Sequence, residues 1–137
     1  MREILFSAKR FDNGEWVEGT PFQEYSDFWG EWQWIIQTKH PLTNAPYLHL
    51  EVNKKTLRQF TGLNDKNGKK IFEGDIVRYM QNGIMVVVWN NESAAFVGAY
   101  SAINFNYCAT LINGHMYLEV IGNIYDNPEL LEDNNND

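Results

Sequence analysis

Short apolar stretches separated by Asn-Gly pairs make up much of the chain. Residues 84–89 (IMVVVW) are apolar at consecutive positions, which is typical of a strand buried on both faces. Asn-Gly is favoured at the two central positions of a type I′ turn. Each pair therefore predicts an antiparallel hairpin between its flanking strands. The pairs are Asn13-Gly14, Asn67-Gly68, Asn82-Gly83 and Asn113-Gly114.

The same pattern predicts a β-rich second half. Expected strands cover residues 76–80, 84–89, 94–100, 107–112 and 116–125. Gly98 and Gly122 lie inside two of them, where glycine indicates a bulge or a sharp bend. About five strands in hairpin order between residues 57 and 125 predict a small closed barrel.

The N-terminal third is less regular. Residues 4–8 and 15–18 are expected to pair through Asn13-Gly14, and the proline-broken stretch 40–52 is expected to carry one more strand. We assign residues 1–53 to an irregular β-containing, aromatic-rich element and residues 54–128 to the barrel. Residues 129–137 form a short acidic tail, and the fold class is mainly β.

Helical periodicity is limited to two short segments. Residues 54–60 follow Asn53, a favourable N-cap. Residues 128–132 begin with a proline, which suits the first helical position, after Asn127 as a cap. The last residues, EDNNND, are expected to be disordered.

Composition adds limits on compartment and cofactors. With 137 residues and 44% hydrophobic positions, the chain can bury a core without a metal or a disulfide. The single cysteine, Cys108, excludes an intramolecular disulfide and fits a reducing compartment. No apolar run is long enough for a signal peptide or a membrane span. We expect a cytoplasmic protein that binds no membrane.

Charge is distributed unevenly along the chain. The net charge is −7, which argues against general affinity for nucleic acid. Residues 54–78, however, carry seven basic and three acidic side chains, and no lysine or arginine follows them. This basic island is a candidate contact for a partner or for nucleic acid. It consists of Lys54, Lys55, Arg58, Lys66, Lys69, Lys70 and Arg78.

Two motifs resemble the YopX family of bacteriophage and prophage proteins. One is QFTGLNDKNGKKIFEGDIV at residues 59–77, and the other is EVIGNIYDNPELL at residues 119–131. The opening MREILF is also similar to that family's start. The resemblance implies a C-terminal barrel of the SH3-like type and a phage or prophage origin. It implies no catalytic residue, because the family has no established activity.

The first motif contains no metal or phosphate site. Asp65-Lys66-Asn67-Gly68 is similar to the middle of a calcium loop, but Leu63 and Gly74 would then occupy positions that need carboxylates. The glycine-to-lysine spacing of a phosphate-binding loop is also absent. We therefore interpret the stretch as a lysine-bearing hairpin tip, and we expect no metal and no cofactor.

Other chemistry-bearing residues are scattered. His40, His49 and His115 lack the spacing of metal ligands. Cys108 lies in a predicted strand without a basic neighbour, as expected of a small buried hydrophobe. Glu73 and Asp75 flank a turn glycine, which disfavours acid–base chemistry. We name no catalytic residue and expect no enzyme.

The tract YSDFWGEWQW at residues 25–34 is the densest aromatic patch. Its rings are expected either to pack within the chain or across a subunit contact, or to stack on bases. Asp27 and Glu31 lie within the tract and disfavour a nucleic-acid backbone. The candidate interface residues are Tyr25, Phe28, Trp29 and Trp32.

Four functions remain in competition. A self-associating, non-enzymatic interaction module ranks first, because the basic island and the acidic C-terminal third can meet across subunits. Its other partner would be a host or phage protein. A nucleic-acid-binding barrel that uses the basic island ranks second. An acidic mimic of DNA and an enzyme rank below both.

Overall fold

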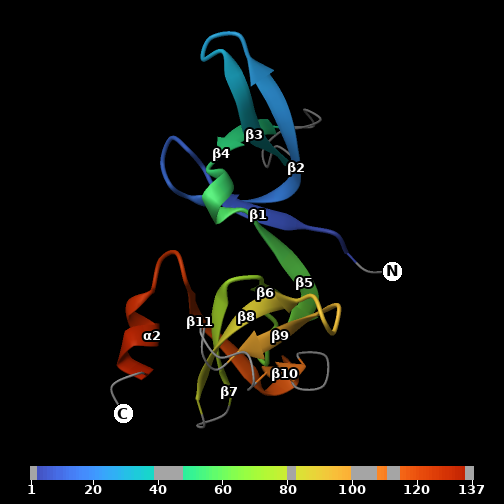
Figure 1. Cartoon of the computed structure of the whole chain (residues 1–137), viewed down its shortest axis with the longest axis vertical. Coiled ribbons are helices and arrows are strands. Elements are labelled where there is room, and N and C mark those ends of the chain that lie inside the picture. Colours follow the sequence, from blue (N-terminus) through green and yellow to red (C-terminus); the bar gives the residue numbers. More distant parts are fainter. Residues whose placement is uncertain (1–2, 39–47, 80–82, 100–107, 111–114, 135–137) are drawn as a thin grey trace. The chain divides into compact units, whose positions relative to one another are not determined.

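The computed structural model describes residues 3–38, 48–79, 83–99, 108–110 and 115–134 (Figure 1). The chain divides into two compact units, Met1–Gln59 and Phe60–Asp137. Antiparallel β-strands dominate both, which confirms the predicted mainly β class. His40, Asn82 and the Asn113-Gly114 pair lie outside the described residues.

The first unit is a meander of four antiparallel strands, followed by a turn of 3-10 helix and the start of a fifth strand. Its elements are β1 (Phe6–Lys9), β2 (Trp16–Ser26), β3 (Glu31–Thr38), β4 (Leu48–Val52), η1 (Lys54–Thr56) and the start of β5 (Arg58–Asn64). Strand β4 and helix η1 confirm the expected strand and helical turn near residue 53. Asn53 Oδ1 accepts a hydrogen bond from Lys55 N at 3.0 Å, as an N-cap does.

Strand β2 changes partners along its length. Its residues up to Gly19 pair with β1, and from Thr20 onward they pair with β3. A Cβ atom at Gly19 would collide with the backbone carbonyl of Gln37, so only glycine fits at this change of partner. The long β2–β3 hairpin that results was not predicted. It extends beyond β1 and β4 in Figure 1.

The core of this unit lies at the base of the hairpin. Ala8, Ile36 and Val52 are buried together, and Val17, Trp34 and Leu57 pack against them. Strand β4 pairs with β3 only from Trp34 to Thr38. Among the described residues, the outer part of the hairpin is therefore a two-stranded ribbon.

The second unit begins within β5 and contains a five-stranded antiparallel sheet. Its further elements are β6 (Lys70–Phe72), β7 (Asp75–Tyr79), β8 (Ile84–Asn90), β9 (Ala95–Ala99), β10 (Cys108–Thr110), η2 (His115–Tyr117), β11 (Leu118–Asn123) and α2 (Glu129–Asn134). The sheet order is β10-β9-β8-β7-β11, and β5 pairs with β6.

The closed barrel that was predicted is not observed in the described residues. Strands β10 and β11 lie at opposite ends of the sheet order, and no described pairing joins them. The turn between β5 and β6 instead meets β11 through isolated hydrogen bonds, such as Lys66 N to Leu118 O at 2.9 Å. Single bonds of this kind do not extend the ladder that barrel closure requires.

Strand β8 is the centre of the second core. Met85, Val86 and Val87 are buried in succession, which confirms a strand covered on both faces. The core cluster comprises Ile71, Val77, Met85, Val87 and Leu118. Gly98 on β9 serves close packing, because a Cβ atom there would lie 2.9 Å from Met85 Sδ.

Two local predictions need correction. Among the described non-glycine residues only Ala94 has a positive φ, so neither Asn13 nor Asn67 takes the type I′ conformation. Asn13 Oδ1 instead accepts from Glu15 N at 2.9 Å, and an aspartate side chain holds the turn at Asn67. Helix α2 (Glu129–Asn134) confirms the short helix expected at residues 128–132 and extends it into the stretch assigned to a tail. The bulge expected at Gly122 is confirmed by a register shift after Val120.

Candidate functional site

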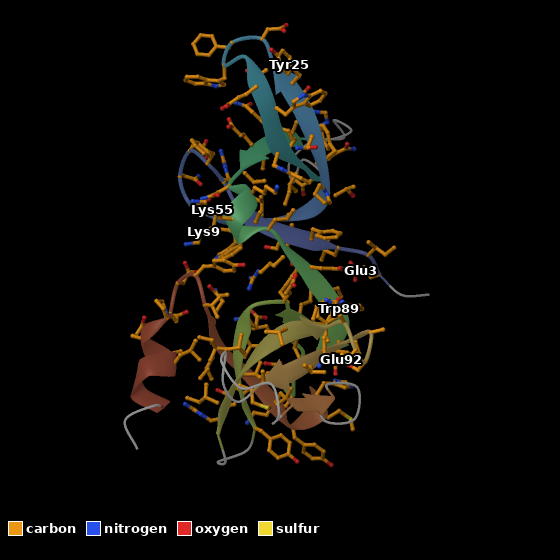
Figure 2. The ribbon with its side chains drawn as sticks, viewed as in Figure 1. Glu3, Lys9, Tyr25, Lys55, Trp89 and Glu92 are labelled. Carbon is orange, nitrogen blue, oxygen red and sulfur yellow. The ribbon has the colours of Figure 1, made fainter. Side chains whose placement is uncertain are left out.

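The outer part of the β2–β3 hairpin carries the candidate aromatic residues Tyr25, Phe28, Trp29 and Trp32. Figure 2 labels Tyr25 near the end of this hairpin. All four side chains are largely exposed to solvent. Their exposed fractions are 49% for Tyr25, 85% for Phe28, 63% for Trp29 and 63% for Trp32. Among the described residues, none of the four packs against the core of the first unit. Trp34 does, because it is half-buried against the core of the first unit.

Cross-strand register divides the ribbon into two chemically different faces. Gln23 pairs with Trp34 and Tyr25 pairs with Trp32. Directly opposed residues share a face, and alternate residues along a strand do too. We call Gln23, Tyr25, Trp32 and Trp34 the aromatic face. The other side is the polar face, which consists of Glu24, Ser26, Glu31 and Gln33.

The turn at the end of the hairpin is held by its own hydrogen bonds. Ser26 Oγ accepts from Trp29 N at 3.1 Å, and Ser26 O accepts from Gly30 N at 2.8 Å. Gly30 has φ +69°, which glycine adopts without strain. Phe28 and Trp29 meet edge to face with centroids 4.7 Å apart. Phe28 and Trp29 are therefore presented by a defined turn, and Tyr25 and Trp32 by the strands on either side of it.

The hairpin is acidic as well as aromatic. Residues 16–38 contain Glu18, Glu24, Asp27 and Glu31 but no lysine or arginine. A cation does reach the base of the aromatic face, where Lys54 Nζ lies 5.7 Å from the centroid of the Trp34 ring. That distance is within the range of a cation–π contact.

The basic island does not form one surface within either unit. Lys54, Lys55 and Arg58 belong to the first unit, and the other four residues belong to the second. Arg58 is only 8% exposed, and its guanidinium carbon lies 4.1 Å from the centroid of the Trp16 ring. The side chain of Lys55, on η1, is exposed.

In the second unit, an acidic residue lies among the cations. Lys66 Nζ forms an ion pair with Glu119 Oε2 at 3.2 Å. Arg78 is the cross-strand partner of the same Glu119. Lys70 Nζ lies 6.0 Å from the centroid of the Phe60 ring, and Lys69 is exposed at the turn. The positive charge that a ligand would meet on this surface is therefore smaller than the number of basic residues in the sequence indicates.

Asp65 acts as the organising group of the lysine-bearing turn. Its Oδ1 accepts from Asn67 N and Lys69 N, and its Oδ2 accepts from Val120 N, each at 2.9 Å. Burial by itself would raise the pKa of Asp65. The three backbone donors and the charge of Lys69 outweigh burial, so the pKa lies below its ordinary value. This role was missed, although aspartate two residues before Asn-Gly is a known turn signal.

Asp75 has a similar structural role at the next turn. It is buried, and its Oδ2 accepts from Phe72 N at 2.7 Å. Between Phe72 and Asp75, Gly74 has φ +85°. A Cβ atom at Gly74 would lie 3.3 Å from the Tyr125 ring. The Glu73-Gly74-Asp75 step is thus part of the turn into β7.

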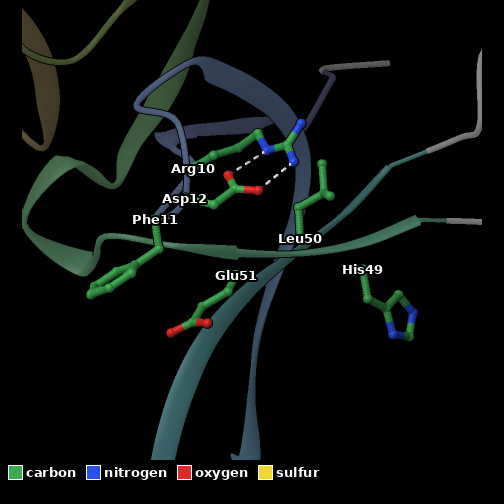
Figure 3. Close-up of a pocket in the computed structure, with 6 residues that line it drawn as sticks. All are labelled: Arg10, Phe11, Asp12, His49, Leu50 and Glu51. Carbon is green, nitrogen blue, oxygen red and sulfur yellow. Dashed lines mark hydrogen bonds and ion pairs between the residues drawn. The ribbon is translucent and has the colours of Figure 1, made fainter.

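An open pocket of about 220 Å³ lies between β4 and the loop after β1 (Figure 3). Its lining residues are Arg10, Phe11, Asp12, His49, Leu50 and Glu51. Arg10 and Asp12 engage each other through two hydrogen bonds, which raise the pKa of Arg10 and lower that of Asp12. The volume is below the roughly 300 Å³ at which small-molecule sites begin.

The remaining candidate residues are dispersed. His49 meets Phe22 edge to face, and His115 Nδ1 hydrogen-bonds Asn64 O at 2.7 Å. Cys108 begins β10. Within the described residues, no group of three or more His, Cys, Asp or Glu is arranged to hold a metal ion. No helix in that part of the chain is both long and apolar enough to cross a bilayer.

Comparison with known proteins supports the resemblance of the two motifs. A crystal structure of protein EF1440 from Enterococcus faecalis matches with a TM-score of 0.55 and 24% identity, over 96% of this chain and 99% of that chain. At this identity the likeness concerns the fold alone. None of the curated proteins matches. The family model described as YopX protein matches residues 5–132, nearly the whole sequence, and the chain therefore belongs to the YopX family.

Proposed function

We propose that this chain is a non-enzymatic interaction module, encoded by a phage or prophage, that binds a second copy of itself in the bacterial cytoplasm. The observation that carries the proposal is the exposure of Tyr25, Phe28, Trp29 and Trp32 at one end of a single hairpin. Tryptophan and tyrosine dominate the energetics of protein contacts. Apolar patches of this kind on a soluble surface mark interaction sites.

The absence of catalysis is part of the proposal and rests on how the carboxylates are used. Among the described residues of the second unit, Asp65 and Asp75 are the buried acidic side chains, and both accept hydrogen bonds from backbone amides that shape turns. A general base must instead be within reach of a substrate proton. The phage origin and an SH3-like arrangement of the second unit follow from the family resemblance.

Nucleic-acid binding through the basic island is the alternative function. The exposed side chains of Lys55, Lys69 and Arg78 favour it. Glu119 opposes it in the second unit, and the acidic hairpin opposes it in the first. Binding to phosphates would weaken steeply with salt. Labelled DNA or RNA whose mobility shifts at low salt, and no longer shifts after Lys69→Glu with Lys70→Glu, would establish this alternative.

Sedimentation velocity over a range of concentrations tests the proposal. We expect wild type to form a concentration-dependent oligomer. Replacing Trp29 and Trp32 by serine should raise the dissociation constant by about 30-fold or more, the effect of losing one strong hot-spot ring. Trp89→Ser is the matched control, because Trp89 is also an exposed tryptophan but lies on β8. Wild type that remains monomeric at every concentration contradicts self-association.

A further inference from the structure

We propose that the exposed rings of the β2–β3 hairpin are a docking surface for an arginine-rich segment of a partner protein. This adds the chemistry of a second partner to the proposed interaction module, and it does not require self-association. Three features of the first unit point to such a partner. They are the cations already placed on its tryptophan rings, the charge of the hairpin and the open outer edge of β3.

Tryptophan rings of the first unit already receive cations from the chain itself. Lys54 Nζ lies 5.7 Å from the centroid of the Trp34 ring. The guanidinium carbon of Arg58 lies 4.1 Å from the centroid of the Trp16 ring, and Lys9 Nζ lies 5.6 Å from it. A cation within about 6 Å of a ring centroid is attracted by the ring, most strongly by tryptophan. Binding a cation is thus a use that this unit makes of its tryptophans.

Trp32 offers the same kind of ring to solvent. It lies two residues before Trp34 on β3, so both belong to the aromatic face, about 7 Å apart along the strand. Trp32 is 63% exposed and meets Tyr25 edge to face with centroids 5.6 Å apart. An edge-to-face pair leaves at least one face of each ring uncovered by its partner. A cation from another molecule can therefore sit on Trp32 as Lys54 sits on Trp34.

The charge of the hairpin favours a cationic occupant over the alternatives. Residues 16–38 contain four acidic side chains and no lysine or arginine. Three of the acidic side chains are exposed and directly precede an exposed ring in the sequence; these are Glu24, Asp27 and Glu31. Complementary charge speeds encounter and excludes wrong partners. Phosphate backbones and anionic lipids would be repelled. A basic protein segment is attracted both by the rings and by the carboxylates.

The outer edge of β3 lets one segment reach both faces of the ribbon. Among the described strands, β4 pairs with β3 only from Trp34 onward, so the edge from Glu31 to Gln33 is open. Trp32 points to the aromatic face and Glu31 to the polar face. An extended segment along this edge presents successive side chains to the two faces in turn. Consecutive arginines fit, because a guanidinium stacks on aromatic rings and also binds carboxylates through two hydrogen bonds.

A labelled peptide tests this assignment directly. The probe is a fluorescein-labelled run of consecutive arginines between glycine and serine residues. One comparison peptide has citrulline at each arginine position, which keeps the shape and removes the charge, and another has lysine. Fluorescence polarisation at low salt, with the full chain titrated into each peptide, gives the dissociation constants. We expect the arginine peptide to bind several-fold more tightly than the lysine peptide, and the citrulline peptide not to bind.

Variants of the hairpin locate the contact. Trp29→Ser with Trp32→Ser should weaken binding of the arginine peptide by about 5-fold or more, the effect of losing two cation–π contacts. Glu31→Gln should weaken it by about 2-fold or more. Matched controls are Trp89→Ser and Glu92→Gln, which change an exposed tryptophan and an exposed carboxylate of the second unit. We expect both controls to bind like wild type, and circular dichroism checks the fold of each variant.

The outcomes separate this partner from self-association. A second copy seated on the same rings would compete with the peptide, so excess arginine peptide should dissociate any oligomer seen by sedimentation. A comparison peptide that binds as tightly as the arginine peptide, or equal losses in hairpin and control variants, overturns the inference. So does a wild type that binds no peptide, and an oligomer then leaves self-association standing. Peptide binding by a wild type that is always monomeric supports the inference and removes self-association alone.

Discussion

Replacing Asp65 by asparagine tests how the lysine-bearing turn is held. The carboxylate is buried and accepts hydrogen bonds from three backbone amides, two on Oδ1 and one on Oδ2. Asparagine keeps one acceptor oxygen and places an NH₂ group where the other was. Whichever way the amide turns, it faces at least one backbone N–H with a donor.

The expected loss of stability depends on which of the three backbone N–H donors water can reach in the variant. Hydrogen bonds to a charged group contribute about 1.5–3 kcal/mol, and a buried donor left without a partner costs about 1–3 kcal/mol. Val120 is half-buried on β11, whereas Asn67 and Lys69 are exposed and their amides can bond to water. We expect Asp65→Asn to lower the free energy of unfolding by about 2–3 kcal/mol. Asp65→Ala should cost up to about 4 kcal/mol.

The effect depends on pH with a defined sign. The pKa of folded Asp65 is lowered, because its backbone hydrogen bonds outweigh burial. A lowered folded pKa contributes stability that is complete above the unfolded value of about 3.9 and is lost as the pH falls through the folded value. The difference between wild type and Asp65→Asn should therefore be full near neutral pH and shrink below about pH 4.

Urea unfolding, with hydrogen exchange at the Val120 amide, measures the loss. Glu92→Gln is the matched control, because it removes one carboxylate charge from an exposed turn. We expect the control to unfold like wild type. If Asp65→Asn is as stable as wild type, and the Val120 amide is equally protected, Asp65 does not hold the turn to β11.

Further substitutions test the packing of each unit by thermal or urea unfolding. Gly19→Ala should destabilise the first unit by about 3 kcal/mol or more, because the new methyl group meets the Gln37 carbonyl; wild-type stability would contradict the described change of strand partner. Leu118→Ala should cost about 2–5 kcal/mol in the second unit, since Leu118 is buried in its core; a loss below 1 kcal/mol would place it outside the core. Asp12→Asn should leave the melting temperature unchanged, because its ion pair with Arg10 is exposed. A clear drop would show that this pair supports the fold.

The strands of the second half could be predicted from the sequence, because apolar runs and turn residues are local signals. An apolar run such as residues 84–89, which follows an Asn-Gly pair, has few structural alternatives to a buried strand. These residues do form the buried strand β8. The β2–β3 hairpin was missed because its turn, Asp27–Gly30, has no Asn-Gly pair and its strands are dense in aromatic residues. Period-two alternation from Trp32 to Trp34 was a signal that could have found it.

The candidate site was harder to predict, because charge counts ignore burial. Arg58 and Lys66 were both counted in the basic island. In the structure, however, Arg58 is buried against the Trp16 ring and Lys66 forms an ion pair with Glu119. Both arrangements depend on residues more than 40 positions away. The exposure of Trp29 and Trp32 likewise depends on how far the ribbon extends past the core, which no local pattern encodes.

Sedimentation equilibrium of wild type at low and high salt tests the central claim most directly. Raising the salt from 0.1 M to 1 M shortens the screening length from about 10 Å to about 3 Å. A contact made by aromatic rings between two copies that each carry a net charge of −7 should hold or tighten as repulsion is screened. Dissociation at high salt would show that attraction between opposite charges, and not the aromatic hairpin, joins the copies.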